Sequence, residues 1–451
     1  MVEHSNSPLN QQKHRNQQKP GTQQDAKDKL ARFAEDPVFL RLDGETRRFI
    51  SRKAEELRLS HQDLRSLIET AADFEMWGLP PVEELWDEEG TEQLTGKVKR
   101  RRILDRLLDR HTKEKEKGPD YRSLSGGPPP KGHLKYSYLR EDSTILGTCP
   151  VAGEKTRCCN LQTLDAVQQC GFACSYCAIQ SFYGDGKVFF FENLEEKLNK
   201  LSLELDPRRT YHIGTGQSSD SLMWGNRRGL LDSLLDFAGE NPNVILELKS
   251  KSALVEPLLA KKVPPNILAA WSLNPEEVIH NEEHLTSNLD ARIGAARRAA
   301  DRGILVGFHF HPIIRFSGWK EKYARIYRML QEEFSPSEVA MVSLGTLTYP
   351  KPVVRLIRSQ KIRSGVLKMP LENSADKLSY PFEIKRELFS HAYESFSEKW
   401  RREVFFYLCM EDPELWEPVF GFSYPSNEEF EEAMKAAYME KIRSLGKSAN
   451  K

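Results

Sequence analysis

Short β-rich runs alternate with amphipathic helical runs through the middle of this 451-residue chain. The predicted strands are residues 161–168, 210–216, 244–249, 267–273, 304–312 and 339–346. The predicted helices between them are residues 193–205, 227–238, 253–261, 289–302 and 318–333. Strands that alternate with helices in this way are typical of parallel sheets. The pattern predicts an α/β fold, a partial (βα)6 TIM-like barrel rather than a doubly wound sheet.

Polar or glycine-bearing clusters stand at the carboxyl ends of these predicted strands. They are residues 170–177, 214–220 and 249–251, Ser272 with Asn274, His309 with His311, and residues 345–346. In barrels of this kind the active site lies on the loops that follow the carboxyl ends of the strands. The clusters are therefore expected to meet at one mouth of the barrel.

Each of these clusters also has a purely structural explanation. Ser219 and Asp220 could bind a ribose or an amino group, or they could cap the following helix. Lys251 could hold a carboxylate or phosphate, or it could be a surface lysine at a helix start. His309 and His311 share the interior side of their strand, where they could contact substrate or bond to other interior side chains. A zinc site there would need a third ligand, which the sequence does not supply.

Three cysteines, Cys170, Cys174 and Cys177, have the spacing CxxxCxxC. Thiolates at this spacing can hold an Fe–S cluster, zinc or Cu(I). No cysteine or histidine follows at the spacing of a zinc finger. The motif therefore indicates an incomplete zinc site or a cluster with one coordination position open, and the second interpretation predicts catalysis. The chain has seven cysteines, an odd number that fits a reducing compartment better than a disulfide framework.

The composition excludes a membrane span and leaves a nucleic-acid partner undecided. Lys plus Arg and Asp plus Glu both total 66, so any basic surface must be local. The N-terminal stretch has no apolar signal region, and no apolar run approaches the ~18 residues that span a bilayer. We expect a cytoplasmic monomer without membrane contact.

Composition also divides the chain into segments. The predicted segments are a disordered Gln- and Asn-rich tail at residues 1–25, a helical N-terminal module at 26–117, a Gly- and Pro-rich linker at 118–132, the partial barrel at 133–350 and a C-terminal α+β extension at 351–451. Ser60 and Asp63 are spaced as a capping box at the start of one predicted helix in the N-terminal module. The barrel segment is the one that carries the polar clusters.

A basic stripe runs along one predicted helix of the N-terminal module. Its members are Lys99, Arg102, Arg106, Arg110 and Lys113. This stripe could contact phosphates, or it could be the solvated face of an amphipathic helix. If it binds phosphates, the chain could be a nucleic-acid-binding protein in which the cysteines hold only a structural metal.

The cysteine motif at residues 170–177 resembles the signature of the radical S-adenosylmethionine (SAM) enzymes, whose fold is a partial (βα)6 barrel. Further stretches resemble the spore photoproduct lyase family, within about residues 170–393. They are Ser219-Asp220, Lys251, and residues 271–275, 286–293, 307–312 and 318–319. The resemblance implies a radical SAM enzyme like these carbon–carbon lyases, which repair a thymine dimer in DNA.

The resemblance also implies roles for particular residues. Cys170, Cys174 and Cys177 would each bind one iron of a [4Fe–4S] cluster, and the fourth iron would bind SAM. The residues that would hold SAM are Ser219, Asp220, Lys251 and Ser272, with Tyr176 as an aromatic side chain beside it. The reduced cluster would cleave SAM to methionine and a 5′-deoxyadenosyl radical. The implied partners are a DNA substrate and a reducing protein such as flavodoxin or ferredoxin.

Two positions depart from the family pattern. Gln217 occupies the position of the hydrogen-donating cysteine of the lyases, and Ala178 occupies that of a second tyrosine. An amide cannot donate a hydrogen atom as a thiol does, so a radical SAM enzyme with a different substrate stays open. The other cysteines match no family position, and the catalytic hydrogen donor is left unassigned. These cysteines are Cys149, Cys158, Cys159 and Cys409.

Overall fold

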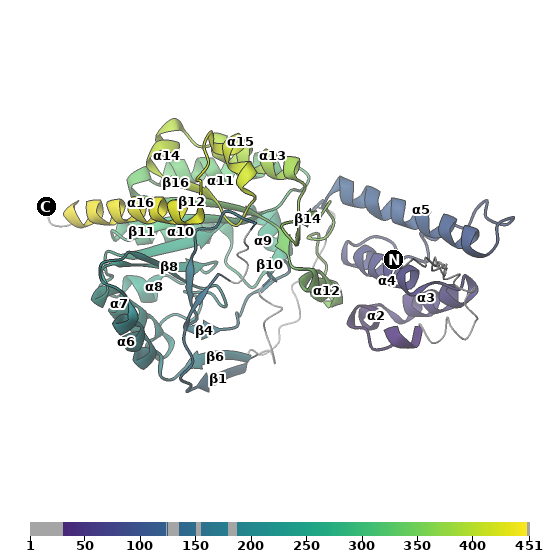
Figure 1. The fold of residues 1–451 in the computed structure, drawn as a ribbon, viewed down its shortest axis with the longest axis horizontal. Helices are drawn as coiled ribbons and strands as arrows, with labels where there is room; N and C mark the ends of the chain where they lie inside the picture. The colour runs from purple at the N-terminus through teal and green to yellow at the C-terminus, as the bar shows by residue number, and fades with distance from the viewer. Residues whose placement is uncertain (1–29, 123, 125–134, 150–154, 179–186, 449–451) are drawn as a thin grey trace, which may run out of the picture.

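The computed structural model describes residues 30–122, 124, 135–149, 155–178 and 187–448. Within these residues, a group of helices at the N-terminal side lies next to a larger α/β body (Figure 1). The predicted disordered tail at residues 1–25 and most of the predicted linker at 118–132 lie outside the described residues. No helix in the described part of the chain is both long and apolar enough to cross a bilayer.

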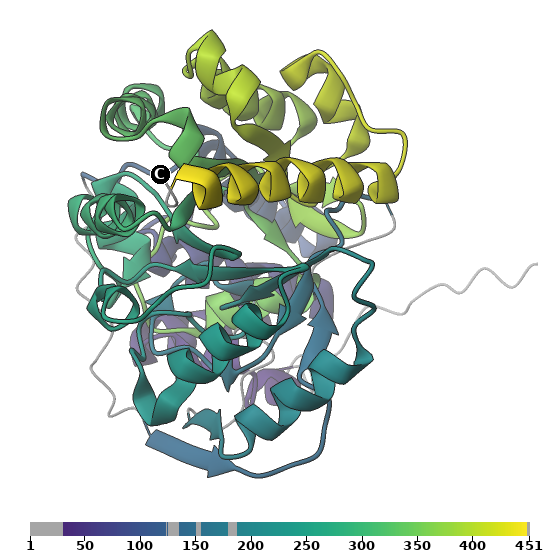
Figure 2. The ribbon, with the colours of Figure 1, turned by 90° about the vertical axis from the view of Figure 1, so that its left-hand side faces the viewer.

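An eight-stranded sheet forms the centre of the α/β body, with the order β16-β12-β11-β9-β8-β7-β3-β2. Its strands are β2 (Leu146–Thr148), β3 (Gln162–Leu164), β7 (Tyr211–Thr215), β8 (Val244–Ser250), β9 (Ile267–Ser272), β11 (Leu305–Ile313), β12 (Val339–Thr346) and β16 (Phe405–Leu408). All neighbours are parallel except β2 and β3. The sheet curls into a half barrel (Figure 2), which confirms the predicted fold class.

Helices cover the outer face of this sheet. They include α6 (Leu194–Glu204), α7 (Leu230–Glu240), α8 (Glu256–Leu259), α10 (Leu289–Asp301) and α11 (Trp319–Glu333), whereas α9 (Glu276–Glu282) lies beside the short strand β10 (Glu283–His284) that follows it. On β11 the phenylalanines point outward, because the rings of Phe308 and Phe310 lie 5.1 Å from Phe334 and 4.9 Å from Tyr327 of α11. The alternate residues of β11 therefore face the interior, as the two-residue period predicts.

The first predicted strand is divided between two sheets. Residues 162–164 form β3 of the main sheet, whereas β4 (Val167–Gln168) pairs antiparallel with β6 (Lys187–Phe191). A third strand, β1 (Lys135–Leu139), is parallel to β6 and completes this small sheet. Asp165 marks the break, since its carboxylate accepts a hydrogen bond from Ser218 Oγ at 2.6 Å. The chain thereby leaves the barrel wall before it reaches Cys170.

Two elements from the C-terminal part complete the barrel. β16 extends the sheet beyond the six predicted strands by pairing with β12 from Met341 opposite Phe405 to Leu344 opposite Leu408. Helix α16 (Asn427–Ser448) contacts β8, β11, β12 and β16, and its buried side chains include Phe430 and Met434. α16 therefore closes the interior of the half barrel with apolar side chains.

The remaining elements are the N-terminal helices, one helix that contacts them, a small three-stranded sheet, and three C-terminal helices beside β12, β16 and α11. They are α2 (Pro37–Arg41), α3 (Gly44–Glu56), α4 (His61–Met76), α5 (Gly96–Lys117), α12 (Lys351–Ser359), α13 (Phe382–Glu394), α14 (Glu398–Glu403), α15 (Trp416–Phe420) and the strands β13 (Thr348–Tyr349), β14 (Glu372–Ser374) and β15 (Lys377–Ser379). The predicted capping box of Ser60 and Asp63 is present at the start of α4. Arg358 of α12 binds the buried Asp73 of α4 and so joins the N-terminal helices to the body.

Candidate functional site

A cavity of about 250 Å³ lies at the carboxyl ends of the parallel strands. The predicted site residues in its wall are Cys170, Cys174, Tyr176, Cys177, Gln217, Ser219, Asp220, Lys251, Ser272 and His311. These residues come from separate strand ends that are far apart in the sequence. The structure thus brings the predicted clusters together, while their roles in binding stay predictions.

The loop that carries the three cysteines is held by a short antiparallel ladder. β5 (Ala173–Cys174) pairs with β10 (Glu283–His284), so that Cys174 lies opposite Glu283. The next residue, Ser175, donates a backbone hydrogen bond of 2.8 Å to the carbonyl of Glu282, and its hydroxyl bonds to the Glu282 side chain. The cysteine loop is therefore fixed to the segment between α9 and α10.

The three thiols line one cavity. Among the described residues, no three His, Cys, Asp or Glu side chains are spaced to hold a single metal ion. A four-iron cluster binds each thiolate through a separate iron, so three thiols in the wall of one cavity fit such a cluster. Burial raises the pKa of Cys174 to about 12 and that of Cys170 well above its ordinary value, so cluster binding would displace their protons.

Asp220 holds two loops of the cavity wall in place. Its Oδ1 accepts hydrogen bonds from the backbone of Leu222 (3.0 Å) and Met223 (2.9 Å) and from Ser250 Oγ (2.8 Å). Its Oδ2 accepts one from the backbone of Lys251 at 2.7 Å. These four contacts use most of the carboxylate's acceptor capacity. Asp220 therefore orders the turn after β7 and the end of β8, whereas helix α7 begins only at Leu230.

Ser219 and Gly216, in the same turn as Asp220, also contact other parts of the protein. Ser219 Oγ donates to the carbonyl of Gln169 at 2.8 Å and accepts from Trp224 Nε1 at 2.9 Å. Gly216 has φ = 82°, and a Cβ at this position would lie 2.6 Å from the carbonyl oxygen of Lys249. Only glycine fits there without distortion, so the turn that presents Ser219 to the cavity depends on it.

Ser272 and Lys251 are the polar side chains best placed to meet a ligand. Ser272 is 1% exposed, and its Oγ has no hydrogen-bond partner although it lies on the cavity wall. The ammonium of Lys251 lies 5.9 Å from the ring centroid of Tyr176. Within the described residues, no carboxylate comes within 4.0 Å of this ammonium. A buried hydroxyl and an unpaired cation together favour a polar, negatively charged ligand group.

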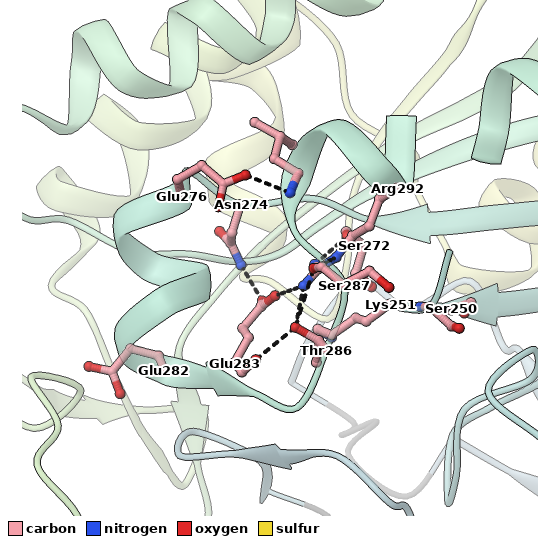
Figure 3. Close-up of polar contacts among 12 residues, drawn as sticks. Ser250, Lys251, Ser272, Asn274, Glu276, Glu282, Glu283, Thr286, Ser287 and Arg292 are labelled. Atoms are coloured by element: carbon pink, nitrogen blue, oxygen red, sulfur yellow. Dashed lines mark hydrogen bonds and ion pairs between the residues drawn. The ribbon is translucent and has the colours of Figure 1, made fainter. Parts of the chain in front are cut away.

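A buried polar network supports the wall from behind (Figure 3). Glu283 accepts hydrogen bonds from Asn274 Nδ2 at 2.8 Å and from the hydroxyl of Tyr176. Arg292 pairs with Glu283 at 2.6 Å and donates to the carbonyl of Ser272 at 2.9 Å. Burial would raise the pKa of Glu283, but the Arg292 guanidinium and Lys251 hold it below its ordinary value. The network thus fixes Tyr176 and Ser272 through one ionised carboxylate.

The two histidines of β11 have different environments. His309 Nε2 lies 2.6 Å from Glu247 Oε1, and His212 Nε2 lies 2.8 Å from the other oxygen of the same carboxylate. Burial lowers the pKa of His309 to about 4, so its ring is neutral at physiological pH. His311 lies on the cavity wall, with Nε2 2.6 Å from Ser343 Oγ. His309 is therefore an interior hydrogen-bonded residue, and His311 is the histidine that a bound molecule could reach.

Comparison with known proteins assigns the family. The spore photoproduct lyase family profile matches residues 162–382, which contain all the predicted cluster and SAM residues. The spore photoproduct lyase of Clostridium acetobutylicum is 26% identical over 224 residues, 48% of this chain and 64% of that protein. Residues 162–382 of this chain carry the spore photoproduct lyase family domain. The lyase of a Geobacillus species is 24% identical over 212 residues, 46% of this chain and 61% of its own length, so the chain spans less than two thirds of either relative.

A solved structure of the family has the same fold. A spore photoproduct lyase complexed with dinucleoside spore photoproduct aligns with a TM-score of 0.51 and 20% sequence identity, over 68% of this chain and 94% of that chain. This similarity agrees with the half barrel described above, because that half barrel is the TIM-like fold of radical SAM proteins. The alignment leaves about a third of this chain without a counterpart in that structure.

The departures from the spore photoproduct lyase family pattern lie on the cavity wall itself. Gln217 and Ala178 both line the cavity. Of the four cysteines that the sequence left unassigned, Cys409 also lines it, directly after β16. Sequence reasoning could not place Cys409 there, because it depends on the pairing of β16 with β12. The same holds for Glu283 and Arg292, whose roles depend on the pairing of β10 with the cysteine loop.

Proposed function

We propose that this protein is a radical SAM enzyme that binds a [4Fe–4S] cluster through Cys170, Cys174 and Cys177. The observation that carries the proposal is that these thiols share one cavity with the unpartnered hydroxyl of Ser272 and the unpaired ammonium of Lys251. Three thiolates leave one iron of such a cluster without a protein ligand. A small polar molecule can bind at that iron only if the adjacent wall offers polar contacts, as it does here.

In this proposal the chain's own residues bind and orient SAM. Lys251 meets the carboxylate of SAM, Ser272 Oγ donates or accepts one hydrogen bond, and the Tyr176 ring forms an apolar wall. Ser219 and Asp220 line the same site and hold its loops. A bound, reduced cluster supplies the electron that cleaves SAM to a carbon radical able to take a hydrogen atom from the substrate. The enclosed barrel mouth excludes water and other hydrogen donors from that radical.

For the substrate we propose a thymine photoproduct in DNA. Support comes from the family and from the solved relative that is complexed with dinucleoside spore photoproduct. The presence of Gln217 on the cavity wall favours a second candidate, a radical SAM enzyme with a different substrate. The proposed electron donor is a flavodoxin or ferredoxin, and the proposed location is the cytoplasm.

Anaerobic reconstitution tests the cluster and the cleavage of SAM. We expect about four irons per chain and the release of 5′-deoxyadenosine under reducing conditions. Cys174→Ala should lose both, whereas Cys158→Ala should keep both, because Cys158 is buried without lining the cavity. Zinc binding without SAM cleavage would refute the proposal. It would support a structural metal in a nucleic-acid-binding protein, and then the Cys174→Ala protein should still bind duplex DNA.

The substrate is tested separately. Active enzyme, SAM and a reductant are incubated with a dinucleoside spore photoproduct, and formation of the repaired thymidine units is measured. Their formation would support photoproduct repair. If SAM is cleaved and no repaired thymidine appears, the substrate is a different one, and deuterium-labelled candidates can be screened by transfer of deuterium into 5′-deoxyadenosine.

A further inference from the structure

Two tyrosines and two arginines form an exposed surface beside the small sheet. We call Tyr136, Tyr138, Arg227 and Arg228 the tyrosine–arginine surface. The tyrosines belong to β1, and the arginines belong to the turn Arg227–Gly229 that precedes α7. Arg227 Cζ lies 4.6 Å from the ring centroid of Tyr136, and Arg228 Cζ lies 4.0 Å from that of Tyr138. Each guanidinium is thus held against an aromatic ring.

The charges of this surface are not neutralised by the protein. Arg227 and Arg228 are exposed, and in the described part of the chain no carboxylate lies within 4.0 Å of either guanidinium. Lys135 and Lys187 stand opposite each other at the start of β1 and β6 and add positive charge to the same sheet. A guanidinium stacked on a ring has already lost part of its conformational entropy, so less is lost when it binds a ligand. Its N–H groups can still donate hydrogen bonds to an anion, which favours phosphate binding.

One layer of aromatic rings joins this surface to the cavity. Trp224 Nε1 donates a hydrogen bond of 2.9 Å to Ser219 Oγ, which lies on the cavity wall. The Trp224 ring is in edge contact with Phe190 of β6 at 5.5 Å and with Tyr136 at 6.1 Å. A molecule on the tyrosine–arginine surface would therefore lie next to the cavity mouth.

We propose that the tyrosine–arginine surface binds a DNA strand whose neighbouring nucleotide enters the cavity. Arg227 and Arg228 would contact phosphates, and the Tyr136 ring would stack with a base. Tyr136 remains 42% exposed despite its contact with Arg227, so part of its ring is accessible to a ligand. Aromatic rings interleaved with cations are the pattern by which proteins bind unpaired nucleic-acid strands. The assignment of the ligand as DNA rests on the proposed function, whereas the arrangement of the tyrosine–arginine surface is observed independently of that function.

Fluorescence anisotropy with a labelled single-stranded oligodeoxynucleotide and the reconstituted full chain tests this proposal. The test variant is Arg227→Gln with Arg228→Gln. The matched control is Arg102→Gln with Arg110→Gln, two exposed arginines of α5 that the structure leaves without an ion pair among the described residues. Figure 1 shows α5 among the N-terminal helices, apart from β1 and β6. Both double variants change the net charge of the protein equally. A difference in their DNA affinity therefore depends on where the arginines lie, not on the total charge.

We expect the test variant to bind at least about tenfold more weakly and the control to change by less than about twofold. Each phosphate contact of a single strand contributes about 0.7 to the slope of log K against log salt, so the test variant should lose about 1.4 from that slope. Tyr136→Leu keeps an apolar side chain but removes the flat ring. It should weaken binding by about fivefold or more, with the slope unchanged.

Other outcomes would overturn the proposal. These are absence of binding by the unchanged protein, equal losses in the two double variants, or a larger loss in the α5 variant, which would assign binding to the basic stripe. Unfolding curves must show that the variants are folded. Cleavage of SAM without DNA is measured in the same samples. If the unchanged protein cleaves no SAM but the variants still differ in DNA binding as expected, the proposed radical SAM function is refuted. The proposal that the tyrosine–arginine surface binds a DNA strand is then still supported.

Discussion

Arg292 and Glu283 form an ion pair of 2.6 Å in which neither side chain is exposed to solvent. Glu283 Oε2 accepts no hydrogen bond, so its contact with the Arg292 guanidinium is that of an ion pair. Because Arg292 lies on α10 and Glu283 on β10, the pair ties a barrel helix to the ladder that holds the cysteine loop. The position of the three thiols therefore depends on an arginine that lies outside the cavity wall.

Replacing Arg292 with Met should destabilise the protein strongly. The change leaves the Glu283 carboxylate buried without a cation, which costs about 3–5 kcal/mol of the free energy of unfolding. Arg298→Met in the same helix removes an arginine that pairs with Glu256 at the surface, and it should cost less than about 1 kcal/mol. Urea denaturation of the two variants measures the difference. Similar losses of unfolding free energy in the two variants would mean that the buried ion pair stabilises the protein no more than the surface pair does.

Ser272→Ala should separate ligand binding from stability. Ser272 Oγ has no partner in the protein, so its removal should leave the free energy of unfolding unchanged or slightly higher. If it bonds to SAM, affinity should fall by about two- to tenfold in equilibrium dialysis.

The control for this prediction is Ser250→Ala, at the end of the neighbouring strand. Ser250 Oγ donates to Asp220 and accepts from the backbone of Ser252, both at 2.8 Å. Its loss should destabilise the fold by about 1–3 kcal/mol. Unchanged SAM affinity in Ser272→Ala would remove Ser272 from the proposed SAM contacts.

Glu282 should make stability depend on pH. Burial raises its pKa from 4.5 to about 7, although hydrogen bonds from Ser175, Ser364 and the backbone of Gly365 oppose the shift. The folded protein then holds a proton that the unfolded chain releases above pH 4.5. The stabilising contribution is complete below pH 4.5 and is lost as the pH rises through 7, on the order of 3 kcal/mol in total.

Denaturation at a series of pH values checks the role of Glu282. The difference in unfolding free energy between the unchanged protein and Glu282→Gln should vary between pH 4.5 and 7 and be constant outside that range. Glu383→Gln, which alters an exposed carboxylate of α13, should show no such variation. A constant difference across the series would mean that Glu282 has the same pKa in the folded and unfolded states.

Arg358 should control the attachment of the N-terminal helices. Its guanidinium donates two hydrogen bonds of 2.8 Å to the wholly buried Asp73. Arg358→Met leaves that buried carboxylate without its guanidinium partner, so we expect a loss of about 3–5 kcal/mol of the free energy of unfolding and faster proteolysis between α5 and the barrel. Arg355→Met, which removes an arginine paired with Asp36 nearer the surface, should behave like the unchanged protein. Equal proteolysis of both variants would contradict the prediction.

The sequence was informative where structure follows from local pattern. The predicted strand at residues 339–346 coincides with β12, and the helix at 318–333 differs from α11 by one residue, because a buried parallel strand and an amphipathic helix each have a clear period. The convergence of the strand ends followed from the geometry of a barrel. Neither inference needed contacts between distant residues.

The features that the sequence missed all depend on such contacts. β16 looks like an isolated β-rich run until it pairs with β12, and only that pairing brings Cys409 to the cavity. Glu283 is an ordinary acidic residue after a helix until β10 meets the cysteine loop. At the break between β3 and β4, Asp165 likewise accepts a hydrogen bond from Ser218, on a different loop. Short-range periodicity contains no information about these partners.

The position of β16 and α16 also affects how the protein is made. The ribosome synthesises the other strands of the main sheet before residue 350, whereas β16 and α16 emerge after residue 400. Until then the β12 edge has unpaired backbone groups, and the polar interior around Glu247 lacks the helix that closes it. The nascent barrel is thus an open-sided intermediate for much of its synthesis, a state in which exposed strand edges favour aggregation. Completion of this barrel is a late event that the cell must protect.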